Sequence, residues 1–302
     1  MKLSLAELID PRLLPLVEPS QTFYENRAAG RGPRDLEELH AARARLPAPA
    51  PSKPAAVQEV VEVHGRSVPL RIHMPLREQA TGVVLEIHGG GFYMGSAARS
   101  DIRNRQLADA QGVAIVSVDY RLAPEQPWPA APDDCETAAL WLVEHVADRF
   151  GTTKLGIMGF SAGATLAMGT LLRLRDRGIR AIDTAVLQFG TYDLSAQTPA
   201  GRLIGDEYFL EAYAGDAADR SHPDLSPIYA DLEGLPPVLM MVGEADILLQ
   251  DNLAMTACLS AAGVDVDLRV YPDAPHGFTG HPTPMALAAL EDIESWFKEH
   301  LR

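Results

Sequence analysis

Residues 154–177 read KLGIMGFSAGATLAMGTLLRLRDR. The apolar run Lys154–Phe160 has the length and composition of a buried strand, and the alanine-rich run Ala162–Arg177 has those of a helix. Ser161 stands between them, with a glycine two residues away on each side. A turn too tight for side chains at these glycines would expose the serine hydroxyl above a sheet, as a nucleophile requires. A serine that only caps the helix fits the same residues, so this motif alone leaves both interpretations open.

The same alternation of strand and helix continues along the chain. Short runs rich in Val, Ile and Leu predict strands at 82–87, 114–119, 154–160, 181–188, 237–242 and 265–271. Helical patterns predict helices at 101–111, 132–149, 162–177, 251–262 and 284–300. Buried strands separated by helices predict an α/β fold with a mostly parallel central sheet and helices on both faces.

Two regions fall outside this alternation. Residues 3–46 have a helical pattern that puts Leu36, Leu39 and Ala42 on one face, and the proline-rich stretch PAPAPSKPAA then predicts a linker near 47–54. After it, VQEVVEV and VPLRIHM, joined at HGRS, predict an antiparallel hairpin. Residues 192–235 are long and mixed, which predicts an insertion or a lid.

Composition narrows the classes of partner and compartment. A chain of 302 residues with 47% hydrophobic content can form one packed domain, and its net charge of -15 would repel nucleic acids and anionic lipid surfaces. Glu7 and Asp10 interrupt the N-terminal leucines before a signal core forms, and no run approaches the ~18 apolar residues of a spanning helix. Cys135 and Cys258 lack a paired spacing, so we expect a reduced, cytoplasmic protein.

A glycine-rich loop, HGGGF at 88–92, follows the predicted strand at 82–87. Glycines let backbone N–H groups turn towards a developing negative charge without a side chain in the way, as in an oxyanion hole. A dinucleotide-binding loop is the rival interpretation. However, Met94 stands where its third glycine would be, and no lysine follows as in a phosphate-binding loop.

An exposed serine of this kind needs a histidine base and an acid that orients it, carried on later loops in the order acid, then histidine. Asp246 in VGEADIL and His276 in PDAPHGF satisfy this order. Three other carboxylates lie near these loops. Glu244 is at the very start of its turn, Asp251 near the start of a helix whose dipole explains it, and Asp273 in a proline-bounded turn.

Five motifs together, HGGGF, DYRLAPE, GFSAG, GEADIL and PHGF, resemble those of hormone-sensitive-lipase-like (family IV) carboxylesterases of the α/β-hydrolase fold. The resemblance runs from about Val57 to the C-terminus and implies a serine esterase that works through an acyl-enzyme. It implies a catalytic triad formed by Ser161, Asp246 and His276. It also implies an oxyanion hole formed by the N–H groups of Gly89, Gly90 and Ala162.

The resemblance also implies how substrate is bound. Family members hydrolyse small esters of short and medium acyl chains without cofactor or metal, and many are homodimers. Segments 1–50 and 192–235 would form a cap on a single domain, 1–302, with Phe92 and Tyr93 as pocket walls. His276 and His281 lack a third ligand at suitable spacing, which predicts no metal site.

Three residues set this chain apart or lack an explanation. Phe160 stands where the family commonly has an acidic residue, and Ala164 where it commonly has a glycine. Neither belongs to the triad, and we expect Phe160 to make the substrate site more apolar. Glu86, within an apolar strand, needs a partner that the sequence does not identify.

Two alternatives use the same residues. An amidase or deacetylase would share the triad, and only its substrates would distinguish it from an esterase. Some relatives are ligand-binding receptors with a broken triad. Here serine, acid and histidine are all present, which argues against a receptor.

Overall fold

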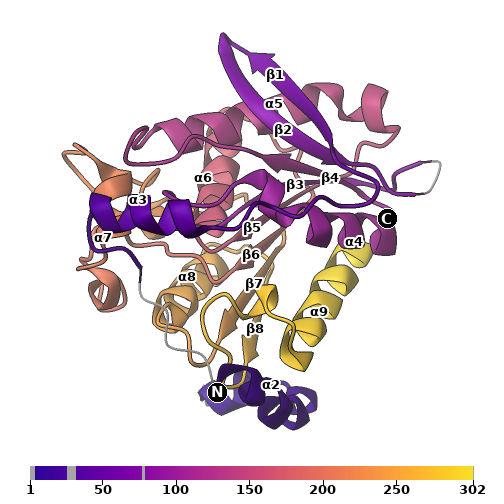
Figure 1. The fold of residues 1–302 in the computed structure, drawn as a ribbon. Coiled ribbons are helices and arrows are strands. Elements are labelled where there is room, and N and C mark those ends of the chain that lie inside the picture. Colours follow the sequence, from indigo (N-terminus) through magenta and orange to yellow (C-terminus); the bar gives the residue numbers. More distant parts are fainter. Residues whose placement is uncertain (1–3, 26–31, 77–78, 302) are drawn as a thin grey trace.

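A computed structural model of the chain describes residues 4–25, 32–76 and 79–301 (Figure 1). Its centre is one eight-stranded sheet of order β1-β2-β4-β3-β5-β6-β7-β8. β2 runs antiparallel to β1 and β4, and all the other pairs are parallel. The predicted α/β fold with a mostly parallel sheet is therefore confirmed. The strands are β1 Val57–Val63, β2 Arg66–His73, β3 Val83–Ile87, β4 Ala114–Val118, β5 Leu155–Phe160, β6 Thr184–Gln188, β7 Val238–Gly243 and β8 Val266–Tyr271.

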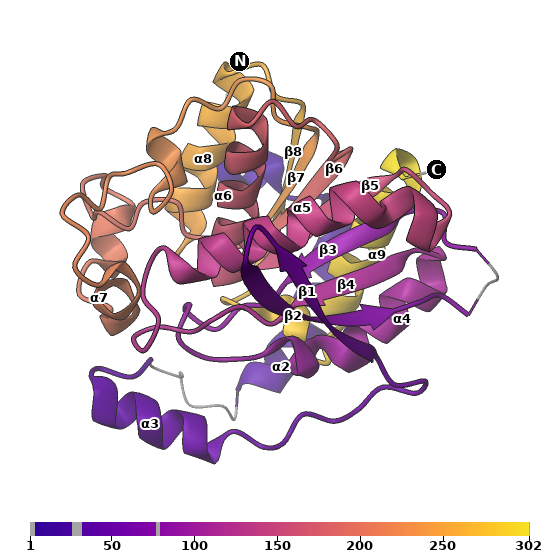
Figure 2. The same cartoon turned by 90° about the horizontal axis from the view of Figure 1, so that it is seen from above.

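Helices cover both faces of this sheet. α5 (Ala130–Phe150), α6 (Ala162–Asp176) and α8 (Leu249–Ala261) pack on one face, and α4 (Asp101–Gln111) and α9 (Pro284–His300) on the other (Figures 1 and 2). No helix among residues 4–25, 32–76 and 79–301 is long and apolar enough to cross a membrane.

The two faces hold two separate hydrophobic clusters. All residues of β3, β4, β6 and β7 are buried, and neighbouring residues of a strand point to opposite faces. Thus Leu85 belongs to the cluster under α5 and α6, whereas Val84 belongs to the cluster under α4 and α9. Burial on both faces explains why these strands read as continuous apolar runs.

Most element ends lie within two residues of the sequence prediction. The hairpin is also confirmed, although its turn contains only His64 and Gly65, both at positive φ, because Arg66 already pairs with Val63. The strand predicted from residue 181 begins at Thr184. Asp183 precedes it, and its carboxylate accepts a hydrogen bond from the N–H of Leu155 at 2.9 Å.

The N-terminal region divides into two parts. α1 (Leu5–Leu8), η1 (Pro11–Leu16) and α2 (Val17–Tyr24) pack by β8 and α9. α3 (Leu36–Arg45) lies apart from the sheet (Figure 2), and Arg43 donates hydrogen bonds to the carbonyls of Tyr93 and Ala123. The predicted apolar face of α3 is only partly right, since Leu39 is buried but Leu36 is 44% exposed. Leu3 and residues 26–31 of the predicted helical region lie outside the described residues.

The irregular segment predicted at 192–235 forms three short helices. They are η3 (Gly201–Ile204), α7 (Tyr208–Ala214) and η4 (Pro227–Tyr229). α7 is anchored by Tyr213, whose ring stacks on Phe92 at 3.9 Å between centroids. Two further short helices, η2 (Ala97–Ser100) and η5 (Phe278–Gly280), follow the glycine-rich loop and His276 respectively.

Two substitutions in α9 measure how much the packing of this helix on the sheet contributes to the free energy of unfolding. Phe297 is 1% exposed, and its ring lies against Gly156 of β5, so Phe297→Ala should lower the free energy of unfolding by ~3–5 kcal/mol. Leu287 on the same helix is 62% exposed, and Leu287→Ala should change it by less than ~0.5 kcal/mol. Equilibrium denaturant unfolding measures both. Equal losses for the two variants would contradict this packing.

Candidate active site

Ser161 occupies a strained turn between β5 and α6. Its φ of 53° and ψ of -121° are rarely adopted by residues other than glycine, and strain of this kind typically costs ~1–3 kcal/mol. A Cβ on Gly159 would lie 2.2 Å from the carbonyl oxygen of Gly163, and one on Gly163 would lie 2.0 Å from that of Ile87. Both glycines are therefore required by close backbone approach, which confirms the tight turn predicted from the sequence.

Ser161, His276 and Asp246 form one hydrogen-bonded chain. Ser161 Oγ lies 2.9 Å from His276 Nε2, and His276 Nδ1 lies 2.9 Å and 3.1 Å from the two carboxylate oxygens of Asp246. The Asp246 side chain is fully buried, whereas that of His276 is 38% exposed. Because Nδ1 donates to the carboxylate, Nε2 can accept the serine proton.

The loops after β7 and β8 bring the acid and the histidine together. A Cβ on Gly243 would lie 2.0 Å from the carbonyl oxygen of Ala274, so the two loops touch through their backbones. The N–H of Ala245 also donates to that carbonyl at 3.1 Å. The N–H of Leu248 donates to Asp246 Oδ1 at 2.8 Å, which fixes the carboxylate that faces the histidine.

Of the other three carboxylates near these loops, Glu244 and Asp251 have partners other than His276. Glu244 accepts from the N–H of Asp273 at 3.2 Å. Asp251 is buried in the first turn of α8 and accepts from the N–H of Tyr192 at 2.6 Å, and burial raises its pKa to about 6. Among the hydrogen bonds of the described residues, His276 has none with these carboxylates.

The backbone of the glycine-rich loop lies directly beside the serine. A Cβ on Gly89 would lie 3.2 Å from Ser161 Cβ and 2.6 Å from the carbonyl oxygen of Phe160. Gly90 has a φ of 126°, and its carbonyl accepts from the N–H of Met94. The sequence predicts an oxyanion hole made by the N–H groups of Gly89, Gly90 and Ala162. Among the described backbone hydrogen bonds outside helices and strands, none is donated by these three N–H groups.

The DYRLAPE segment contacts this loop through the side chains of Tyr120 and Asp119. Tyr120 stacks on His88 at 4.2 Å between ring centroids and donates to the His88 carbonyl at 3.0 Å. His88 Nδ1 lies 2.8 Å from the carbonyl of Gly89, and burial lowers the pKa of His88. Asp119 accepts from the N–H of Ala97 at 2.9 Å, which holds the end of the loop.

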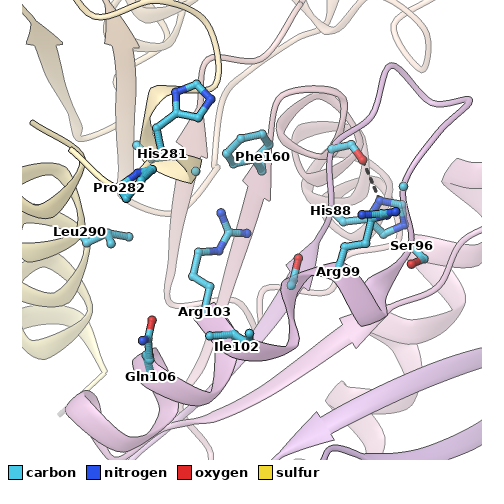
Figure 3. Close-up of a pocket in the computed structure, with 15 residues that line it drawn as sticks. His88, Ser96, Arg99, Ile102, Arg103, Gln106, Phe160, His281, Pro282 and Leu290 are labelled. Atoms are coloured by element: carbon cyan, nitrogen blue, oxygen red, sulfur yellow. Dashed lines mark hydrogen bonds between the residues drawn. The ribbon is translucent and has the colours of Figure 1, made fainter. Parts of the chain in front are cut away.

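The three aromatic residues expected around the substrate lie in different places. Phe92 is fully buried under Tyr213 of α7. Tyr93 is 4% exposed, and burial raises its pKa to about 12. Phe160 is half-buried and lines a cavity of about 560 Å³ beside Gly89 (Figure 3). The roles of Phe92 and Tyr93 as pocket walls stay predictions.

The buried carboxylate of Glu86 has partners that the sequence did not indicate. Ser117 and Ser100 donate to it through their hydroxyls at 2.7 Å and 3.0 Å. Arg103 and Asn104, on α4, donate to it at 3.1 Å and 3.3 Å. These residues come from β4, η2 and α4, so only the folded chain brings them together.

Metal-ligating clusters and cysteine thiols are the remaining reactive groups to place. Within the part of the chain that the structure describes, no three His, Cys, Asp or Glu side chains gather where they could hold a metal ion. Cys135 and Cys258 are free, and burial raises the pKa of the Cys135 thiol.

Known proteins share both the sequence pattern and the fold. The profile of a family described as alpha/beta hydrolase fold matches residues 84–280. Ethyl acetate hydrolase of Pseudomonas putida is 34% identical over 230 residues, which are 71% of this chain and 72% of that protein. The solved structure of a hormone-sensitive lipase from a metagenome library is 28% identical, with a TM-score of 0.74, over 97% of this chain and 99% of that one.

Two other curated relatives are longer than the matched part. Carboxylic ester hydrolase LipN of Mycobacterium tuberculosis is 34% identical over 228 residues, which are 70% of this chain and 61% of LipN. FAD-linked oxidoreductase pytB of Aspergillus terreus is 32% identical over 268 residues, which are 82% of this chain and 32% of pytB. The chain thus spans about a third of the length of pytB.

Two glycines of α6 give a matched test of the serine turn. Gly163→Ala would drive a methyl group to 2.0 Å from the Ile87 carbonyl, so it should lower the free energy of unfolding by more than ~2 kcal/mol. A Cβ on Gly169 meets no atom within 4 Å, so Gly169→Ala should raise it by ~0.5–1 kcal/mol. Denaturant unfolding compares the two. A Gly163→Ala variant as stable as the parent would show that the turn is not constrained by packing.

Proposed function

Because the chain belongs to the alpha/beta hydrolase fold family, in its hormone-sensitive-lipase-like group of esterases, we propose that it is a serine carboxylesterase acting on small esters of short and medium acyl chains. The observation that carries this proposal is the hydrogen-bonded chain from Ser161 through His276 to the buried Asp246. The names of the ethyl acetate hydrolase and LipN support the ester as the substrate class.

The first half of the reaction transfers the acyl group to the enzyme. Ser161 Oγ attacks the ester carbonyl while its proton passes to His276 Nε2, 2.9 Å away. Asp246 stabilises the resulting imidazolium through Nδ1. When the tetrahedral intermediate collapses, the bond to the alcohol oxygen breaks, His276 gives its proton to that oxygen, and an acyl-serine remains.

The second half of the reaction hydrolyses the acyl-serine and regenerates the free Ser161 hydroxyl. A water molecule gives a proton to His276 and attacks the acyl-serine carbonyl, and the carboxylic acid leaves as Ser161 regains its proton. In both halves the carbonyl oxygen becomes negative, and the N–H groups of Gly89, Gly90 and Ala162 are proposed to stabilise it. Removing one such donor in a serine hydrolase costs roughly 10²–10³ in turnover.

A cap from segments 1–50 and 192–235, on the single domain 1–302, is proposed to limit the acyl group. This proposal is supported because both segments contact Tyr93. Arg43 of α3 donates a hydrogen bond to the Tyr93 carbonyl at 2.9 Å, and the ring centroid of Tyr208 in α7 lies 6.2 Å from that of Tyr93. A homodimer is proposed from the family resemblance alone. A cytoplasmic location is proposed from the two free cysteines.

Esterase activity is tested first with p-nitrophenyl esters. Butyrate should be hydrolysed faster than palmitate because a capped pocket can bury only a limited acyl chain. Ser161→Ala should abolish turnover, and a fluorophosphonate should label Ser161, as peptide mass spectrometry would detect. Absence of ester hydrolysis, or inactivation through a different serine, would refute the proposal. Faster turnover of palmitate would refute the chain-length limit alone.

The role of Asp246 is tested with amide substitutions. Asp246→Asn keeps the shape but favours the wrong tautomer of His276, so kcat should fall by roughly 10⁴-fold, as for the analogous change in a serine protease. Glu244→Gln and Asp273→Asn are matched controls, and each should cost less than ~10-fold because, among the hydrogen bonds of the described residues, His276 Nδ1 is joined only to the Asp246 carboxylate. Steady-state kinetics on p-nitrophenyl butyrate measures all three. A collapse in either control with Asp246→Asn active would reassign the acid.

A further inference from the structure

The cavity of about 560 Å³ described above adjoins the reacting serine. Its walls come from α4, η2, η5, the glycine-rich loop, His281 and Pro282 after η5, and Leu290 of α9 (Figure 3). Two wall residues connect it to the catalytic centre: Phe160 precedes Ser161, and Gly89 lies against both of them. A group seated in this cavity is therefore within reach of an ester bound at Ser161.

The charge of this cavity is opposite to that of the protein. The chain carries 26 basic and 41 acidic side chains, for a net charge of -15. Yet Arg99 and Arg103 line the cavity, and none of its described lining residues is acidic. His88 also lines it, and burial lowers the pKa of His88, so the positive charge comes from the arginines.

Arg103 has hydrogen-bonding capacity to spare. Its side chain extends from α4 into the cavity, with the guanidinium carbon 5.2 Å from the centroid of the Phe160 ring (Figure 3). Nη2 donates to Glu86, but the buried Nε–H has no acceptor in the part of the chain that the structure describes. The side chain is 23% exposed, and no hydrogen bond of the described residues includes Nη1, so this nitrogen can donate to an acceptor oxygen of a ligand.

Arg99 adds a second cation at the cavity mouth. It is exposed, and one guanidinium nitrogen donates to the carbonyl of Pro47 at 2.6 Å. No ion pair of the described residues includes it. Since Glu86 offsets only one of the two arginines, this region keeps an excess positive charge.

Glu86 holds Arg103 in place. The carboxylate is 1% exposed and accepts hydrogen bonds from Ser100, Asn104 and Ser117 as well as from Arg103. A guanidinium fixed in this way loses little conformational freedom when it binds an anion. Arginine also matches the planar geometry of a carboxylate.

We propose that this cavity binds a carboxylate carried by the substrate, so that the enzyme prefers esters with an anionic end. The inference rests on the proposed esterase function. Ile102, Phe160 and Leu290 supply apolar walls for the methylene groups between the ester and the carboxylate, and Arg103 and Arg99 bind the carboxylate itself. The expectation from the sequence, that Phe160 makes the substrate site more apolar, did not include the guanidinium of Arg103 over its ring.

Two pairs of substrates test this preference, one for each half of an ester. The first compares the p-nitrophenyl half-ester of adipic acid with its neutral amide analogue, p-nitrophenyl adipamate. The second compares the butyrate esters of 4-hydroxybenzoate and 4-hydroxybenzamide. We expect kcat/KM for the anionic member to exceed that for the neutral member by about 10- to 100-fold in one pair, which tells which half carries the charge.

Variants then assign the preference to the arginines. Arg103→Gln should reduce the anionic-to-neutral ratio by about 10-fold or more, and Arg99→Gln should reduce it less because Arg99 is exposed. Lys298→Gln, near the end of α9, removes an exposed positive charge outside both the cavity and the proposed cap and should leave the ratio unchanged. The double variant Glu86→Gln/Arg103→Gln removes both charges of the buried pair. If it folds and its anionic-to-neutral ratio of kcat/KM also falls, the fall in Arg103→Gln is not caused by leaving the Glu86 carboxylate without its cation.

Binding of free adipate gives a readout that does not need hydrolysis. Calorimetry should detect adipate but not adipamide binding to the parent, with affinity lost in Arg103→Gln. Equal kcat/KM within both pairs, or adipate binding unaffected by Arg103→Gln, would overturn the inference while leaving the esterase proposal intact. If no ester is hydrolysed the esterase proposal fails, and failure of adipate to bind would then refute the carboxylate site as well.

Discussion

The contact between the backbone of Gly163 and the carbonyl of Ile87 is the constraint on which the site depends. It allows α6 to begin immediately after β5, and it presses the glycine-rich loop that follows β3 against the same turn. The unusual backbone of Ser161 persists because β3 is fully buried and β5 is buried up to Phe160. One close approach therefore sets the position of both Ser161 and the neighbouring N–H groups of the glycine-rich loop.

A similar contact on the next two loops completes the arrangement. Gly243 touches Ala274 through the backbone, and this brings Asp246 beside His276. Ser161, Asp246 and His276 thus lie on loops at the same edge of a parallel sheet, where the carboxyl ends of strands gather. Flexible side chains do little of the positioning, since backbone packing has already fixed the distances.

The features that the sequence predicts correctly are those encoded by residues close together in the chain. Glycines around Ser161, strand composition and the order of Asp246 and His276 depend on neighbours in the chain or on a general property of parallel sheets. Sequence reasoning failed for features made by distant segments. The partners of Glu86 come from three elements, the ring of Phe160 meets a cation from α4, and Leu36 is exposed because α3 lies away from the sheet. The periodicity of a single segment carries no information on contacts between segments that are far apart in the chain.

The distance along the chain between Ser161 and His276 has a consequence for synthesis. His276 lies 115 residues after Ser161. At ribosomal speeds of about 5–20 residues per second, the serine emerges roughly 6 to 23 seconds before the histidine. During that interval a nascent chain contains Ser161 without His276, so the proton transfer proposed for Ser161 cannot occur. The hydrogen-bonded chain of the candidate site can form only after β8, the last strand, and the loop that carries His276 have been made.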